Sequence, residues 1–191
     1  AVTEIIIISE TNQKYKYLYN ISVYNLTDKE QEKIFKFLGS TLSANFIALD
    51  TTEGTARAIY RSLELVFPKE NLVWVGFNEK INIDIEKDEQ GHDIFKDGKP
   101  VYKEEYVDSW SIKRLRDLLY EETKIEIPMD YKLDTQLNSV IATQSGNRTL
   151  YHCVASEDHL LAAWRVFAIA EWLNYLTISK PIHRKVFCKS G

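Results

Sequence analysis

The stretch that decides the fold is FIALDTTEGTARAIYRSL, residues 46–63. Residues 45–50 form a short apolar run that ends on a carboxylate, which predicts a buried strand. The segment TTEGT follows it and leads into residues 56–67, which we expect to be helical. In open α/β sheets, ligands bind beyond the carboxyl ends of the strands. Asp50 is therefore a candidate site residue, although a turn aspartate that caps the following helix has the same sequence signature.

The elements around this stretch extend the same pattern. Residues 3–9 and 15–25 predict two strands of a hairpin, because the first is a β-branched run and the second alternates apolar with polar residues. Thr27 and Glu30 form a capping box that opens a helix. Residues 72–77, LVWVGF, predict another buried strand. The order strand, strand, helix, strand, helix, strand indicates a mixed α/β layer structure.

The second half of the chain is less regular. Residues 80–106 are dense in charge and contain two turn signals, so we expect an exposed β-hairpin arm. A helix is expected over residues 109–120, with Lys113, Arg114 and Arg116 facing outward. Two short strands are expected within residues 136–154, and a long apolar helix from Asp158 to Leu176.

Composition restricts the class of protein. The chain has 191 residues, enough for one domain, with 45% hydrophobic and 27% charged residues, as in ordinary globular domains in water. Its longest aliphatic run, residues 5–8, is far shorter than a membrane span, and we expect no membrane partner. The two cysteines, Cys153 and Cys188, make neither a disulfide framework nor a zinc site, which favours a reducing compartment. A net charge of -4 excludes a generally basic nucleic-acid binder but is compatible with a nuclease.

Asp158 is the second candidate site residue. It lies in the triplet Glu157-Asp158-His159, where acidic residues are also the normal caps of a helix N-terminus. The helix that follows is apolar on nearly all sides, so we expect it to pack on the sheet. That packing would bring its first turn near the end of a strand.

Four stretches together resemble the nuclease domain of the large terminase subunit of tailed bacteriophages; the fourth is the opening hairpin with its capped helix, which is similar to the family's second and third strands and first helix. The first is residues 46–63, similar to the family's strand-Asp-x-x-Gly-x-Gly-helix segment with Ala56 at the second glycine. The second is IEIPMDYKLDTQLNSV, residues 125–140, and the third is NRTLYHCVASEDHLLAAWRVFAIAEW, residues 147–172. The third is similar to the terminal motif Asp-Asp/His-x-x-Asp-Ala. The resemblance covers most of the chain except the arm.

The resemblance implies an RNase H-like fold in which a mixed central β-sheet is flanked by helices and carries an exposed β-hairpin arm. It implies one domain over residues 1–191 and two divalent cations, Mg²⁺ or Mn²⁺, held by carboxylates. Asp50 then corresponds to the second-strand acid, and Asp158 with His159 to the acids of the last helix. Two such cations activate a water and stabilise the leaving oxygen, and carboxylates suit these hard ions.

Two departures from the family pattern leave alternatives open. The family's first acid ends a strand that precedes the first hairpin, so we expect that strand upstream, in a longer ATPase-nuclease; substitution by Glu4 or Glu10 is the alternative. Ala162 stands where the family's closing acid is common. Either Asp158 serves in its place, or activity is weakened.

The function implied is a metal-dependent endonuclease of low sequence specificity that cuts concatemeric viral DNA during genome packaging in the host cytoplasm. Its expected partners are double-stranded DNA, the phage portal, the small terminase and the ATPase domain of the same chain. Two rivals remain: a non-catalytic RNase H-like domain that docks DNA or the portal, and an unrelated α/β binding domain. Phosphate contacts are expected from six basic residues: Arg57, Arg61, Lys113, Arg114, Lys132 and Arg148.

Overall fold

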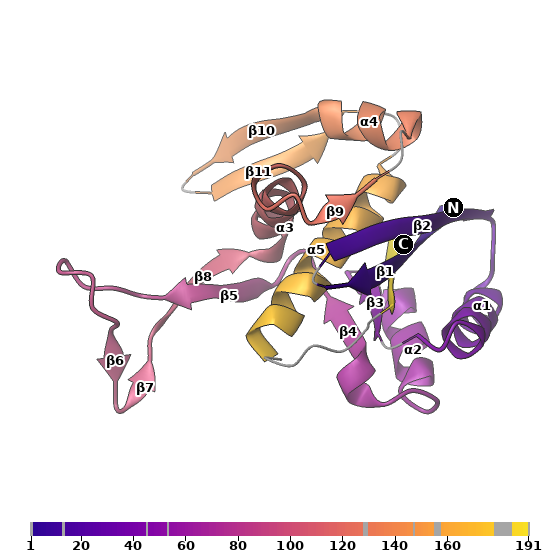
Figure 1. Ribbon diagram of the computed structural model, residues 1–191, viewed down its shortest axis with the longest axis horizontal. Coiled ribbons are helices and arrows are strands. Elements are labelled where there is room, and N and C mark those ends of the chain that lie inside the picture. The colour runs from indigo at the N-terminus through magenta and orange to yellow at the C-terminus, as the bar shows by residue number, and fades with distance from the viewer. Residues whose placement is uncertain are drawn as a thin grey trace.

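The fold is organised around a six-stranded mixed sheet (Figure 1). The computed structural model describes residues 2–12, 14–44, 46–52, 54–127, 130–146, 148–154, 158–177 and 185–190. In spatial order the strands are β4 (Leu72–Val75), β3 (Phe46–Asp50), β12 (Lys185–Ser190), β1 (Val2–Thr11), β2 (Lys14–Tyr24) and β9 (Ile125–Glu126). The expected mixed α/β class is confirmed.

The last strand of the chain lies in the middle of this sheet. β12 runs antiparallel to β1 and parallel to β3, and β4 continues the parallel half beyond β3. β1 and β2 form the expected antiparallel hairpin, with a register shift between Ile7 and Ile8. The sequence analysis did not anticipate β12, although its residues KVFC are typical of a strand.

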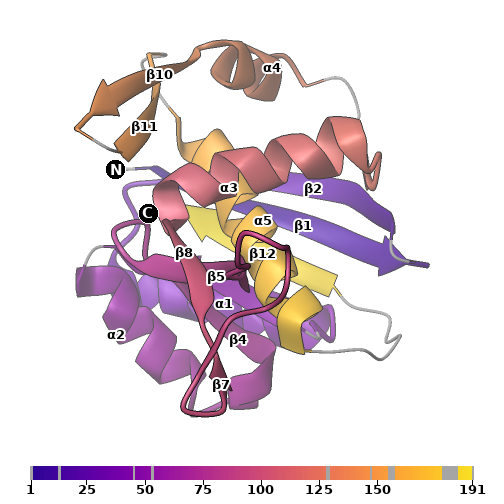
Figure 2. The ribbon, with the colours of Figure 1, turned by 90° about the vertical axis from the view of Figure 1, so that its left-hand side faces the viewer.

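Helices cover both faces of the sheet, because successive residues of each strand point to opposite sides. α1 (Asp28–Thr41) and α2 (Gly54–Leu63) lie on the face to which Ile5, Ile7 and Leu49 point. α5 (His159–Thr177) lies on the other face, against Ile6, Ile8 and Ala48. In Figure 2, α5 and α3 (Val107–Arg116) lie in front of the strands. No helix in the described ranges is long and apolar enough to cross a membrane.

Local sequence signals explain the helix boundaries. Thr27 and Glu30 form the expected capping box: the Glu30 amide donates to Thr27 Oγ1 over 3.4 Å, and the Thr27 amide donates to Glu30 Oε2 over 2.8 Å. α3 begins at Val107, two residues before the expected start, and continues as a π-helical segment, Asp117–Glu121. A short 3-10 turn, Lys69–Asn71, leads into β4.

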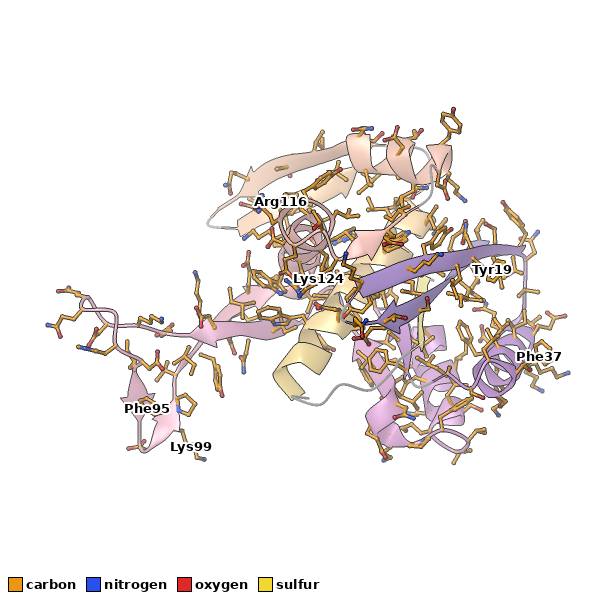
Figure 3. All side chains as sticks on the ribbon, viewed as in Figure 1. Tyr19, Phe37, Phe95, Lys99, Arg116 and Lys124 are labelled. Atoms are coloured by element: carbon orange, nitrogen blue, oxygen red, sulfur yellow. The ribbon has the colours of Figure 1, made fainter. Side chains whose placement is uncertain are left out.

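The expected arm is confirmed and projects away from the sheet (Figure 1). β5 (Lys80–Ile85) and β8 (Tyr102–Tyr106) form its stem, and β6 (Phe95–Lys96) and β7 (Lys99–Pro100) form its tip. Figure 3 shows Phe95 and Lys99 at that tip. The stem is attached to the body where Trp172 Nε1 donates to the Asn82 carbonyl over 3.2 Å.

A second hairpin and a short helix complete the α5 side. β10 (Val140–Ser145) and β11 (Arg148–Cys153) confirm the two strands expected in this region. Ser109 Oγ donates to the Thr149 carbonyl over 2.6 Å and so ties the hairpin to α3. α4 (Tyr131–Asn138) was not expected; it is capped by Asp130, whose side chain accepts from the Lys132 and Leu133 amides.

Candidate functional site

Asp50 lies at the carboxyl end of β3, where it pairs with Val75 of β4. Its side chain shares the face of Phe46 and Ala48, which belong to the core under α5. Asp50 Oδ1 accepts from the Thr52 amide over 2.9 Å, and the Thr51 amide donates to the Val75 carbonyl over 2.8 Å. Asp50 is therefore both the strand-end carboxylate and the organiser of the turn into α2.

The register of the sheet places a second acidic residue in the same row. Lys189 of β12 pairs with Leu49, and Ser190 pairs with Glu4 of β1. Continuing this register by one residue sets Asp50, Ser190 and Glu4 side by side across the sheet. Neighbouring strands are about 4.8 Å apart, so the Cα atoms of Asp50 and Glu4 are separated by about 10 Å.

Glu4 is fully buried and both of its carboxylate oxygens have partners. Ser22 Oγ donates to Glu4 Oε2 over 2.7 Å, and Lys132 Nζ forms an ion pair with Oε1. A buried carboxylate requires such compensation. Glu10, the other expected substitute, lies six residues further along β1, about 20 Å from the Glu4 row.

A chain of contacts connects the end of β3 to the first turn of α3 and to α5. The Phe77 amide donates to Thr52 Oγ1 over 3.2 Å, and the Asp108 amide donates to the Phe77 carbonyl over 3.2 Å. Arg165 of α5 stacks its guanidinium over the Phe77 ring, 4.5 Å from the centroid, and forms an ion pair with Asp108. Sequence reasoning missed Asp108 and Arg165. The signal for Arg165 was available, since it is the one charge within the apolar run of residues 160–170.

Asp158 is exposed and immediately precedes α5. It lies seven residues before Arg165, so the two share one face of the helix at a separation of about 10 Å along its axis. Ala162 lies between them on that face. The first turn of α5 is held by α4, because the Leu161 amide donates to Gln136 Oε1 over 2.7 Å. His159 is half-buried at the start of the helix.

The described residues do not bring a full metal cluster together. No group of three or more His, Cys, Asp or Glu side chains within the described ranges is arranged to hold a metal ion. Glu53 and Glu157, which adjoin Asp50 and Asp158 in sequence, lie outside those ranges. Asp50 and Asp158 occupy the expected kinds of position, a strand end and a helix start, and neither belongs to such a group among the described residues.

Arg57 and Arg61 lie on the exposed side of α2, one helical turn apart. Arg57 Nε donates to the Thr51 carbonyl over 3.3 Å, which places this arginine beside the turn that follows Asp50. Its guanidinium stacks on Trp74, 5.0 Å from the ring centroid. Arg57 therefore lies next to the end of β3, and Arg61 lies one turn further along the same exposed side of α2.

The expectation that Arg114 faces outward is wrong. Arg114 is only 6% exposed, and its Nε and Nη2 donate to Glu171 of α5 over 2.8 and 2.7 Å. Burial alone would lower the pKa of Arg114, but the carboxylates of Glu171 and Glu122 outweigh burial and raise it. α3 packs directly on α5, so the side of α3 that carries Arg114 is an inner side. Burial and the nearby Glu171 also raise the pKa of Tyr15, which donates to Glu171 Oε1 over 3.4 Å.

The other expected phosphate contacts have different surroundings. Lys113 forms an ion pair with Glu105 of β8, and Lys132 with the buried Glu4. Arg148 begins β11, but its side chain lies outside the described part of the structure. Of the six basic candidates, Arg57 and Arg61 are the ones whose described surroundings hold no acidic partner.

Searches against protein-family models, curated proteins and solved structures found no match to this chain.

Proposed function

We propose that this chain is an RNase H-like, divalent-metal-dependent endonuclease domain of the large-terminase kind, which cuts concatemeric viral DNA during genome packaging. The observation that carries the proposal is the place of Asp50. It ends a buried parallel strand next to the central strand, on the face covered by α5. The antiparallel hairpin β1–β2, the parallel pair β3–β4 joined through α2, and helices on both faces support the RNase H-like assignment.

The fit to Mg²⁺ or Mn²⁺ differs between the carboxylates. Asp50 and Asp158 offer hard oxygen ligands, which these ions prefer. Among the described contacts, only one oxygen of Asp50 is engaged. Glu4 and Asp108 do not fit, because Lys132 and Arg165 already neutralise them. Asp50 and Asp158, with His159 beside the latter, are the residues that would hold the cations.

When bound, the cations would supply an activated water and stabilise the leaving oxygen of the phosphodiester. The chain's own residues position the substrate and the ligands. The Thr52 amide fixes the orientation of the Asp50 carboxylate. Arg57 and Arg61 would bind the DNA backbone, and contacts to phosphate carry no sequence preference. This arrangement accounts for the low sequence specificity that we propose.

The DNA is expected to follow α2 and not the arm. Residues 80–106 contain eight carboxylates against five lysines, and such an excess of negative charge repels phosphate. The portal, the small terminase and an ATPase domain of the same chain are the proposed protein partners, in the cytoplasm of the host cell.

The test is cleavage of supercoiled plasmid in Mn²⁺, with EDTA as the blank. We expect nicking by the unmodified chain and its loss in Asp50→Asn, since the amide is nearly isosteric but lacks the charge that holds a cation. The matched control is Asp97→Asn at the tip of the arm, where a backbone φ of 53° suits asparagine equally well. If Asp50→Asn cuts at the unmodified rate, the site is wrongly assigned.

A second candidate function is a non-catalytic RNase H-like domain that docks DNA or the portal. The observation that favours it is the neutralisation of Glu4 by Lys132 and of Asp108 by Arg165, which leaves few open acids at the sheet end. This candidate predicts DNA binding that is unchanged by EDTA and no calorimetric signal for Mn²⁺. Metal binding that is lost in Asp50→Asn would exclude it.

A further inference from the structure

Among the residues that the structure describes, one long edge of the central sheet has no strand partner. β9 pairs with β2 only at Tyr15 and Lys16, and no described strand pairs with the outer side of β2 beyond them. Residues 19–24 therefore form a free edge of six residues, about 20 Å long. Outward-facing backbone N–H and C=O groups on such an edge are a template for pairing with another strand.

The free edge lacks the features by which proteins normally protect an edge strand. Its sequence, YNISVY, contains no charge, no proline and no glycine. The register shift in the β1–β2 pair lies between Ile7 and Ile8, before the free edge begins, so residues 19–24 pair regularly with β1. Tyr19 and Tyr24 are 66% and 60% exposed along it. Uncharged, aromatic and β-branched edges of this kind associate readily.

The charges at the two ends of β2 favour one occupant. Lys14 and Lys16 are exposed at its start, and Asp28, Lys29 and Glu30 are exposed just beyond its end, in the first turn of α1, where the two acidic residues leave an excess of negative charge. An antiparallel pairing of two copies, centred on Ile21, brings the lysine end of each copy to the Asp28 end of the other. A parallel pairing would bring lysine to lysine, which is unfavourable.

We propose that residues 19–24 bind the same edge of a second copy of this chain, antiparallel, to form a two-fold dimer with a continuous sheet. Such an interface is isologous, because each copy presents the same patch. It is independent of the nuclease proposal, since Asp50 lies on the far half of the sheet. A six-residue edge buries less area than standard interfaces, so the dimer forms as a concentration-dependent equilibrium.

The experiment is sedimentation velocity over a wide range of protein concentration, with Tyr19→Lys as the blocking variant. A lysine at this position places a charge within the edge, and charged edge residues oppose pairing with another strand. The matched control is Phe37→Lys on α1, which is 65% exposed and lies away from the edge (Figure 3). We expect the unmodified chain and Phe37→Lys to dimerise with rising concentration, and Tyr19→Lys to remain a monomer.

A charge exchange tests the orientation of the two strands. Lys14→Glu should weaken the dimer, and so should Asp28→Lys; the double variant should restore it. Circular dichroism and thermal melts at low concentration establish that each variant is folded, and Tyr24→Lys replaces Tyr19→Lys if the latter is not. A monomer for the unmodified chain at every concentration overturns the proposal. Dimerisation of folded Tyr19→Lys and Tyr24→Lys overturns it too, and failure of the double variant to recover overturns the antiparallel arrangement.

Discussion

At the scale of single residues, the interior charges of this protein are held in compensated groups. Arg114 lies between Glu171 and Glu122, and Lys124 adds a second cation 2.5 Å from Glu122. Arg114 also stacks over Trp172, 5.4 Å from the ring centroid. This group joins α3 to α5, and α5 is the helix that carries Asp158 and Arg165. Its integrity therefore bears on the geometry of the candidate site.

Removing one member of this group should be costly. We expect Arg114→Met to lower the free energy of unfolding by about 3–5 kcal/mol, because Glu171 would be left as an uncompensated buried charge. Urea denaturation followed by tryptophan fluorescence measures the loss. Arg116→Met is the control, since that side chain is 63% exposed and should change stability by less than about 0.5 kcal/mol. Equal losses in the two variants would contradict the burial argument.

At the scale of elements, short-range signals were sufficient for some predictions and not for others. The capping box of α1 and the strand ending at Asp50 were predictable, because each depends on residues adjacent in sequence. α4 was missed, since its eight residues show only a weak apolar pattern. The inward side of α3 was misassigned because the partner of Arg114 lies 57 residues away, on α5. The Asp108–Arg165 pair was missed for the same reason.

The outer part of the arm can be removed without removing the stem that joins it to the body of the protein. Ile85 pairs with Tyr102, so a two-residue Asn-Gly turn can replace residues 86–101 and close the stem. We expect cooperative unfolding to persist and the free energy to change by less than about 1 kcal/mol, since the removed residues are mostly exposed. Differential scanning calorimetry measures this.

The control for the arm lies at its base. Ile81 is 8% exposed and belongs to the core under α5. Ile81→Ala should cost about 2–5 kcal/mol because it leaves a cavity. A larger loss for the shortened arm than for Ile81→Ala would show that the arm supports the fold.

At the scale of the whole molecule, the sheet is held together by a strand from the end of the chain. The hairpin β1–β2 and the parallel pair β3–β4 make no strand pairing with each other; β12 pairs with both. Sequence reasoning could not place β12, because strand order depends on pairings between residues more than a hundred positions apart. The same holds for the row of Asp50, Ser190 and Glu4.

Proline substitutions test this central position through the backbone alone. Phe187 lies in the interior of β12, and its backbone is paired with a strand on each side, β1 and β3. The N–H of Phe187 therefore faces a paired strand on either side, and Phe187→Pro removes a hydrogen bond of the sheet. We expect loss of the cooperative thermal transition. Lys185→Pro, at the first residue of the strand, should be tolerated far better. Similar melting of the two variants would mean that β12 is dispensable.

The place of β12 also has a consequence for biosynthesis. A ribosome releases the hairpin β1–β2 and the β3–β4 unit long before residues 185–190 emerge. Until then, Ile5–Ile8 and Phe46–Leu49 present open backbone edges, and sheets closed by such distant segments form slowly. The nascent chain therefore passes through a stage in which aggregation competes with folding, and chaperone dependence should persist until residues 185–190 have emerged from the ribosome.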